Sequence, residues 1–241
     1  VNGTATLHSA LVAGGVGPGD EVIVPPLTMA STALAVLYTQ ARPVFADIDP
    51  ETFTIDPGSV AEKITPETKA VIPVSLYGLA PDMDPIMALA DKHDLLVVED
   101  AAQCFLGSYR GRTVGTIGHV GSFSFQNSKH MTCGEGGIVI TSDKALAEKI
   151  RRFTSLGYGL VGAAPGCSKI DKRSLHNPGF ERHVDLGYNY RISEILAAVL
   201  LAQLEKLDQA VAMRRATAEA FDAVVSACSW LTPQKTPDDC E

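Results

Sequence analysis

Short apolar runs alternate with helical patterns along most of the chain, and this alternation constrains the fold more than any other feature of the sequence. Runs such as 70–74 and 95–98 are apolar almost throughout, as in strands covered on both faces. The predicted strands are residues 21–25, 43–47, 69–75, 95–99, 121–125 and 137–141, and the predicted helices between them are 4–13, 31–40, 84–93 and 144–153. The pattern predicts an α/β domain with a mostly parallel sheet.

The last third of the chain has a different character. Residues 157–179 carry repeated glycine and proline with little periodicity, which predicts a long loop. A long helix is expected over 193–225, with Ser193 as its N-cap. Its apolar stripe consists of Leu196, Val199, Leu200, Leu204 and Leu207.

Charge and composition narrow the possible partners. The 241 residues carry a formal net charge of −8, and 20% of them are charged. An acidic chain of this kind has no electrostatic reason to bind nucleic acid or an anionic membrane, so any phosphate must be bound by local devices such as helix N-termini. No apolar run approaches the ~18 residues of a membrane span, and no signal peptide opens the chain.

The five cysteines and the chain ends add two expectations. An odd number of cysteines without a CxxC pair is typical of free thiols, and we therefore expect a cytoplasmic protein. The chain starts at Val1 directly inside a motif and stops at Glu241 in a polar stretch. We expect it to be an internal part of a longer protein.

The segment 122–137 presents a lysine between a strand and a glycine-rich stretch. A strand is expected to end near Phe125, a turn then presents Lys129, and Gly134, Gly136 and Gly137 lead into the next strand. Glycines allow close approach of the backbone to a flat ligand, and a lysine in such a place can form a Schiff base. The alternative is a solvated lysine beside a glycine hairpin.

Two further segments could bind parts of the same ligand. Asp100 follows a buried strand, where ligands bind in open α/β sheets, and could pair with a pyridinium nitrogen. Asn2-Gly3-Thr4-Ala5 precedes an amphipathic helix, so the N–H groups of Gly3, Thr4 and Ala5 could hold a phosphate. The alternatives are helix capping by Asp100 in the one case, and by Asn2 or Thr4 in the other.

Together these segments resemble the DegT/StrS-type sugar aminotransferases among the fold-type I pyridoxal-phosphate (PLP) enzymes. The matching segments are residues 2–5, 99–103 (Glu-Asp-Ala-Ala-Gln), 123–137 and 187–191 (Gly-Tyr-Asn-Tyr-Arg). The resemblance covers nearly the whole chain. It implies a three-layer α/β/α large domain over residues 1–200, lacking its N-terminal part, and a linking helix with the start of a small domain over 201–241.

The resemblance also implies roles for single residues. Lys129 would form the Schiff base with PLP and shuttle protons, Asp100 would pair with the ring nitrogen, and Gln103 would lie near the phenolic oxygen of the cofactor. Asn189 would reach the phosphate in a partner subunit, so that a homodimer shares its active sites; its alternative role is to cap the helix at Ser193. The phosphate-binding residues would be Gly3, Thr4, Ala5 and Ser124.

One position departs from the family pattern. The resembled segment carries an aromatic residue where this chain has Met29, whose sulfur can still pack against a ring; the alternative is a core methionine. Some relatives replace the lysine by histidine and act as dehydratases. Here Lys129 is present, beside His130, and this favours transamination.

The expected reaction moves an amino group from glutamate or glutamine to a keto sugar, most readily a nucleotide-linked keto-deoxysugar. A keto-cyclitol is the nearest competing acceptor, and a non-catalytic PLP-fold sensor is the alternative from another class. No metal site is expected. A nucleotide-binding α/β protein lacks support, because no GxGxxG or P-loop motif follows a predicted strand.

Overall fold

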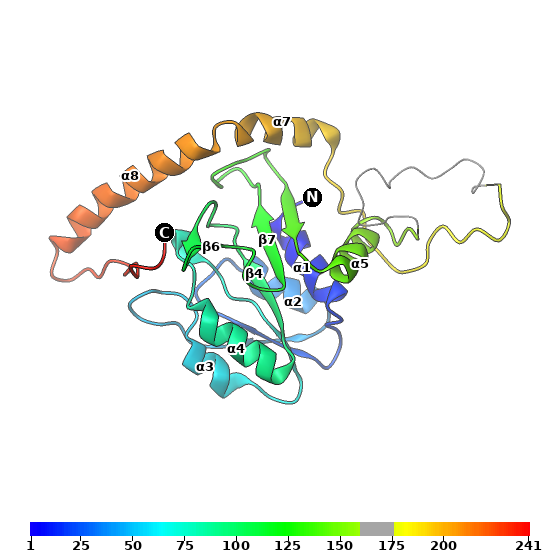
Figure 1. Ribbon diagram of the computed structural model, residues 1–241, viewed down its shortest axis with the longest axis horizontal. Coiled ribbons are helices and arrows are strands. Elements are labelled where there is room, and N and C mark those ends of the chain that lie inside the picture. Colours follow the sequence, from blue (N-terminus) through cyan, green and yellow to red (C-terminus); the bar gives the residue numbers. More distant parts are fainter. Residues whose placement is uncertain (160–175) are drawn as a thin grey trace.

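The computed structural model describes residues 1–159 and 176–241, and its body is one sheet between two layers of helices (Figure 1). The strands follow the order β2-β1-β3-β4-β7-β8, and neighbours are parallel except for the antiparallel pair β7–β8. Their bounds are β1 Glu21–Val24, β2 Arg42–Phe45, β3 Thr68–Val71, β4 Leu96–Asp100, β7 Val120–Ser124 and β8 Gly137–Ile140. The predictions of an α/β fold and a mostly parallel sheet are confirmed.

The two faces of the sheet are covered by different helices. Helices α1 (Gly3–Ala13), α2 (Ser31–Tyr38) and α5 (Lys144–Thr154) pack on the face that includes Val22 and Val24. Helices α3 (Pro57–Lys63) and α4 (Met83–His93) cover the opposite face, toward which Ile23 points. Successive strand residues are therefore buried on alternate sides, which explains why the strands read as continuous apolar runs. This is the three-layer arrangement that the resemblance implied.

Several short elements were not predicted, among them helix α3 and one β-hairpin. Asp56 caps helix α3, since its carboxylate accepts from the N–H groups of Gly58 and Ser59, and Pro57 is the first residue of the helix. The hairpin of β5 (Ser108–Tyr109) and β6 (Arg112–Thr113) turns through positive φ at Arg110 and Gly111. Helix α3 has seven residues and each hairpin strand has two. Segments this short show too few repeats of an apolar pattern to be predicted from it.

The prediction of one helix over 193–225 is wrong. The structure has α7 (Glu194–Leu204) and α8 (Leu207–Ser226), separated at Glu205 and Lys206. The break turns Leu207 inward, where it is 7% exposed among Phe105, Phe125 and Met131. The predicted cap is confirmed, since Ser193 Oγ accepts from the N–H of Leu196 at 3.3 Å.

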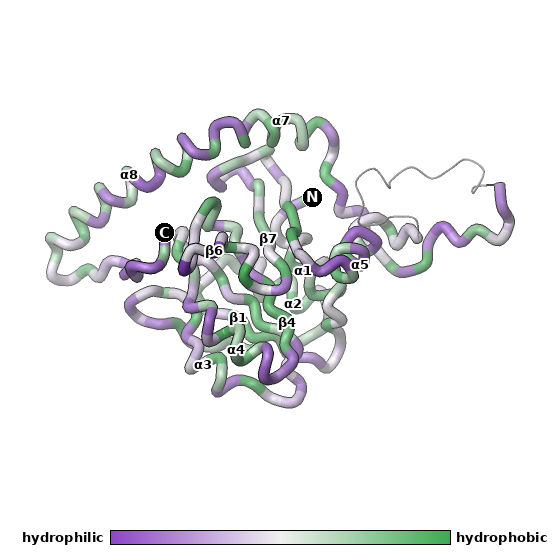
Figure 2. Tube along the Cα trace, viewed as in Figure 1, coloured by the Kyte–Doolittle hydropathy of each residue, from purple (hydrophilic) through white to green (hydrophobic). Residues whose placement is uncertain are grey.

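The apolar stripe predicted for this region is only partly buried. Leu196 and Leu200 pack partly against the cluster around Leu207, whereas Val199 is 45% and Leu204 52% exposed. In Figure 1 the two helices arch over the loop between β7 and β8, and Figure 2 shows polar and apolar residues alternating along α8. No helix among the described residues is long and apolar enough to span a membrane.

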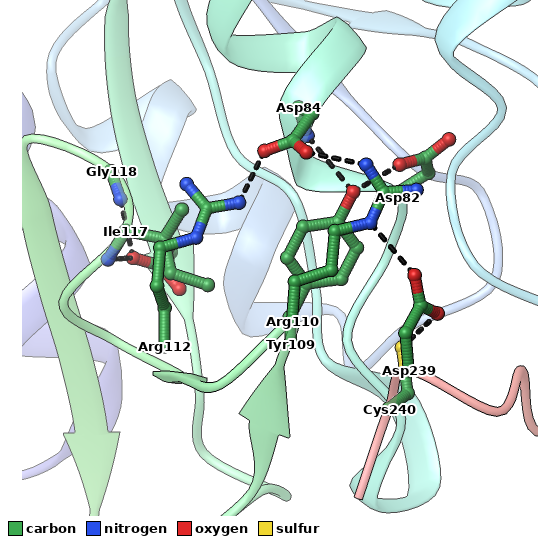
Figure 3. A network of polar contacts seen from close by, with 10 residues as sticks. Asp82, Asp84, Tyr109, Arg110, Arg112, Ile117, Gly118, Asp239 and Cys240 are labelled. Carbon is green, nitrogen blue, oxygen red and sulfur yellow. Dashed lines mark hydrogen bonds and ion pairs between the residues drawn. The ribbon is translucent and has the colours of Figure 1, made fainter.

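The last residues return to the body beside the β5–β6 hairpin (Figure 3). Residue 241 exchanges backbone hydrogen bonds with Ser108, and Arg110 joins Asp239 at 2.7 Å to Asp84 at 2.5 Å. These ion pairs are half exposed, so each contributes little to stability. The predicted loop at 157–179 lies largely outside the described residues.

Candidate active site

The carboxyl ends of β4 and β7 and the N-terminus of α1 surround one cavity of about 450 Å³. Seven of the nine predicted site residues line it: Gly3, Thr4, Met29, Asp100, Gln103, Ser124 and Lys129. These residues are separated by up to 126 positions in the sequence, and the parallel sheet brings them together at one edge. This is the edge at which open α/β sheets bind ligands.

Asp100 ends strand β4 and lies buried at this cavity, with 5% of its surface exposed. Its carboxylate accepts from the hydroxyl of Thr32 at 2.9 Å and from the N–H of Ala102 at 3.2 Å. Burial raises the pKa of Asp100, and these two hydrogen bonds together with the charge of Lys129 oppose that effect. A cationic nitrogen placed against this carboxylate would offset its desolvation.

The α1 terminus forms a cradle suited to an anion. Gly3 and Thr4 lie in the first turn of α1, where a helix supplies no internal acceptor for the N–H groups. A Cβ atom at Gly3 would lie 2.7 Å from the Cβ of Ser124, so only glycine permits this close approach. The hydroxyl of Ser124 lines the same cavity and adds a further donor, and this set of donors suits a phosphate group.

One residue of the predicted cradle is engaged differently. The N–H of Ala5 donates to the side-chain oxygen of Asn2 at 2.9 Å, and Ala5 is 7% exposed. The expectation that Ala5 points its N–H at a ligand is therefore not met by this geometry. The capping role considered for Asn2 is present, and it leaves Gly3 and Thr4 for the ligand.

Lys129 lies in a turn between β7 and β8, where its N–H donates to the carbonyl of Gln126 at 3.0 Å. It borders the cavity described above and an adjoining cavity of about 380 Å³. Gln103 lies at the same boundary and accepts from the N–H of Tyr77 at 3.1 Å. Tyr77 has φ 55°, a conformation that is rare for a bulky residue. The hydrogen bond that Tyr77 donates to the side-chain oxygen of Gln103 helps to hold this conformation.

Met29 lines the cavity with 66% of its surface exposed. The alternative of a core methionine is therefore wrong, and the side chain is available to a ligand. Asn189 is exposed and forms an isolated bridge with Ser155, outside the cavity. Because Ser193 caps α7, Asn189 does not cap that helix.

Thr32 and Glu99 were not predicted as functional residues. Thr32 contacts Asp100 across 68 positions, and no local pattern could have indicated that contact. Glu99 is 2% exposed and accepts from the N–H groups of Gly115, Ile117 and Gly118 at 2.6–2.7 Å. Burial raises the pKa of Glu99, and the three hydrogen bonds oppose that rise. Glu99 thus fixes the loop after β6, beside the strand that carries Asp100.

We expect Glu99→Ala to lower the free energy of unfolding by about 3 kcal/mol or more, because it leaves three N–H groups without their charged acceptor. Chemical denaturation measures the change. The control is Glu62→Ala, at an exposed position of α3, which should change stability by less than about 0.5 kcal/mol. Equal stability of the two variants would contradict the role given to Glu99.

Comparison with known proteins places this site in a family. The chain is 45% identical over 213 residues to GDP-perosamine synthase of Caulobacter vibrioides, covering 88% of this chain and 53% of that protein. It is 42% identical to L-glutamine:2-deoxy-scyllo-inosose aminotransferase of Streptomyces kanamyceticus, covering 98% and 54%. The chain therefore spans about half the length of these relatives.

One of the similar solved structures contains a cofactor. NtdA of Bacillus subtilis, determined with bound cofactor PMP, superposes with a TM-score of 0.72 at 32% identity, over 86% of this chain and 43% of that one. The expectation of a cofactor of the pyridoxal-phosphate type is confirmed at the level of the family. The DegT/DnrJ/EryC1/StrS aminotransferase family matches residues 1–241, and the chain belongs to that family.

Proposed function

We propose that this protein is a PLP-dependent aminotransferase that moves an amino group from glutamate or glutamine to a keto sugar, most readily a nucleotide-linked one. The observation that carries the proposal is a single cavity containing Lys129, buried Asp100 and the open N-terminus of α1. The name of the Caulobacter relative, GDP-perosamine synthase, supports a nucleotide-linked product. The name of the Streptomyces relative supports glutamine as donor, and a keto-cyclitol as the second candidate acceptor.

The residues of the cavity fit this cofactor. Gly3, Thr4 and Ser124 would bind its phosphate, and Asp100 would accept a hydrogen bond from the ring nitrogen and keep a proton there. Met29 lines the same cavity and would pack against the ring. When bound, PLP supplies an aldehyde for the amino group and an electron-poor ring that takes up an electron pair.

Lys129 would perform the proton transfers. Its amine would hold the cofactor covalently at rest and, once released, remove the proton from the α-carbon of the amino donor. Gln103 lines both cavities together with Lys129, and would lie near the phenolic oxygen of the cofactor. The intact pair of Lys129 and Asp100 argues against a non-catalytic sensor.

An acceptor panel tests the proposal. The full-length protein would be incubated with PLP, glutamine or glutamate, and keto sugars linked to different nucleotides, with a keto-cyclitol alongside. Mass spectrometry should find an aminated product from at least one nucleotide-linked keto sugar. Amination of the cyclitol alone would favour the second candidate, and no product from any acceptor would contradict the proposal.

We also propose a cytoplasmic homodimer with shared active sites. Asn189 is exposed between Tyr188 and Tyr190, whose rings stack at 5.2 Å. Helix α7 has no buried residue, and its Ile195 and Leu201 are 77% and 65% exposed. An apolar helix next to an exposed amide is consistent with a second copy covering this region. In this proposal residues 1–200 form the cofactor domain, and 201–241 begin a second one.

Subunit complementation tests the shared site. Mixing inactive Lys129→Ala and impaired Asn189→Ala subunits should restore activity, because one site of each hybrid dimer then has both native residues. If two equal pools exchange at random, about half of the dimers are hybrids, and each hybrid has one intact site of its two. Recovery should therefore approach roughly a quarter of the wild-type activity. The absence of recovery after confirmed subunit exchange would contradict the proposal.

A further inference from the structure

The side chain of Arg214, on helix α8, contacts the turn that carries Lys129. The Nη2 atom of Arg214 donates to the backbone carbonyls of Ser128 at 3.0 Å and Lys129 at 3.2 Å. These contacts join residues that lie 86 and 85 positions apart. A charged donor shared by two carbonyls is stronger than a neutral hydrogen bond.

The same turn also rests on the break between α7 and α8. Leu207 packs with Phe125, Met131 and Cys133, which flank the turn on both sides. The side chains of residues 126–128 restrain the turn only by local hydrogen bonds among exposed groups, such as Ser128 Oγ to Gln126 Oε1 at 2.6 Å. Among residues 1–159 and 176–241, Arg214 is thus the side chain from outside the turn that donates a hydrogen bond to the backbone of Lys129.

The surroundings of Arg214 support a role at this site. Arg214 borders the cavity of about 380 Å³ together with Gln103, Lys129 and His130. Burial lowers the pKa of His130 to about 4, with the charges of Arg214 and Lys129 acting in the same direction, so His130 is neutral there. A neutral His130 does not repel the guanidinium from the turn.

We propose that Arg214 is a positioning residue: it holds the carbonyls of Ser128 and Lys129 so that the lysine amine is presented to the cofactor, and it couples α8 to that lysine. The proposal rests on the function proposed for Lys129. It predicts that Arg214 affects covalent attachment of PLP, and leaves non-covalent binding through the phosphate cradle unchanged.

Arg215 provides a matched control. It is the next residue of α8 and pairs with Glu241 at 2.8 Å, on the exposed surface. Both arginines carry the same charge and the same helix propensity. A comparison of Arg214→Ala with Arg215→Ala therefore isolates the two hydrogen bonds to the turn.

Hydrogen exchange of the full-length protein without cofactor gives the first readout. In Arg214→Ala, amides of residues 126–133 should exchange roughly tenfold faster, as expected for loss of a charged hydrogen bond, and those of β4 should not change. Arg215→Ala should leave both unchanged. Unchanged exchange of 126–133 in Arg214→Ala, or faster exchange throughout the sheet, would overturn the proposal.

The second readout separates attachment from binding. The lysine amine condenses with the aldehyde of PLP and releases water, and borohydride then reduces the carbon–nitrogen double bond to an amine. Arg214→Ala should slow this trapping on the Lys129 peptide roughly tenfold, while its affinity for pyridoxamine phosphate, which lacks the aldehyde, stays within twofold of wild type. The proposal would be overturned if the trapping rate and the affinity for pyridoxamine phosphate fell by the same factor, or if neither changed. If wild-type protein traps PLP on a different lysine, the function proposed for Lys129 fails instead.

Discussion

Lys129→Ala is expected to lose amino transfer by at least about a thousandfold, because the variant has neither the amine that holds the cofactor nor the base that moves the proton. Absorbance of the bound cofactor should lose the band of the lysine-linked form. Within the described residues, Lys129 is the lysine that lines the cavity with Asp100. No other described lysine is placed to replace it there.

The control for this prediction is Lys149→Ala, at an exposed position of α5. That variant should retain the wild-type rate and the same absorbance band. If Lys129→Ala kept a rate within tenfold of wild type, or if borohydride still fixed the cofactor to the protein with equal yield, Lys129 would not be the cofactor lysine.

Asp100→Asn is expected to bind PLP and to lose activity by about a hundredfold or more. An amide cannot keep the ring nitrogen protonated, so the ring no longer takes up the electron pair released at the α-carbon. The amide oxygen can still accept from the Thr32 hydroxyl or the Ala102 N–H, so the fold should be retained. Single-turnover absorbance with glutamine measures the rate of the first half-reaction.

The matched control is Asp91→Asn, on the exposed side of α4. Its rate should equal that of wild type, and its thermal unfolding should be unchanged within about 0.5 kcal/mol. A rate for Asp100→Asn within a few fold of wild type would show that the ring nitrogen does not depend on this carboxylate.

Much of the sheet could be predicted because its inner strands β1, β3, β4 and β7 are largely buried on both faces. Six predicted strands coincide with β1, β2, β3, β4, β7 and β8, with differences of a few residues at their ends. The α1 cap and the cluster of Gly3, Asp100 and Lys129 also follow from motifs of neighbouring residues. The local sequence pattern is sufficient to predict a site residue where that residue lies at the end of a single strand or helix.

Contacts between distant elements could not be predicted in this way. The hydrogen bond of Thr32 to Asp100 and the contacts of Arg214 with the turn depend on how separate elements pack. The break before Leu207 was missed for the same reason, because burial of Leu207 overrides good helix propensity at Glu205 and Lys206. The N–H of Ala5 donates to the side chain of Asn2 and not toward the cavity. The sequence was compatible with either partner.

The central claim, that the cavity around Lys129 and Asp100 carries out amino transfer, is tested most directly by the first half-reaction without an acceptor. The full-length protein would be loaded with PLP, incubated with glutamine or glutamate labelled with nitrogen-15 at the α-amine, and its released cofactor analysed by mass spectrometry. We predict conversion of PLP to pyridoxamine phosphate that carries the label, in proportion to the enzyme present. If the cofactor is bound and remains unlabelled PLP with both donors, the claim is contradicted.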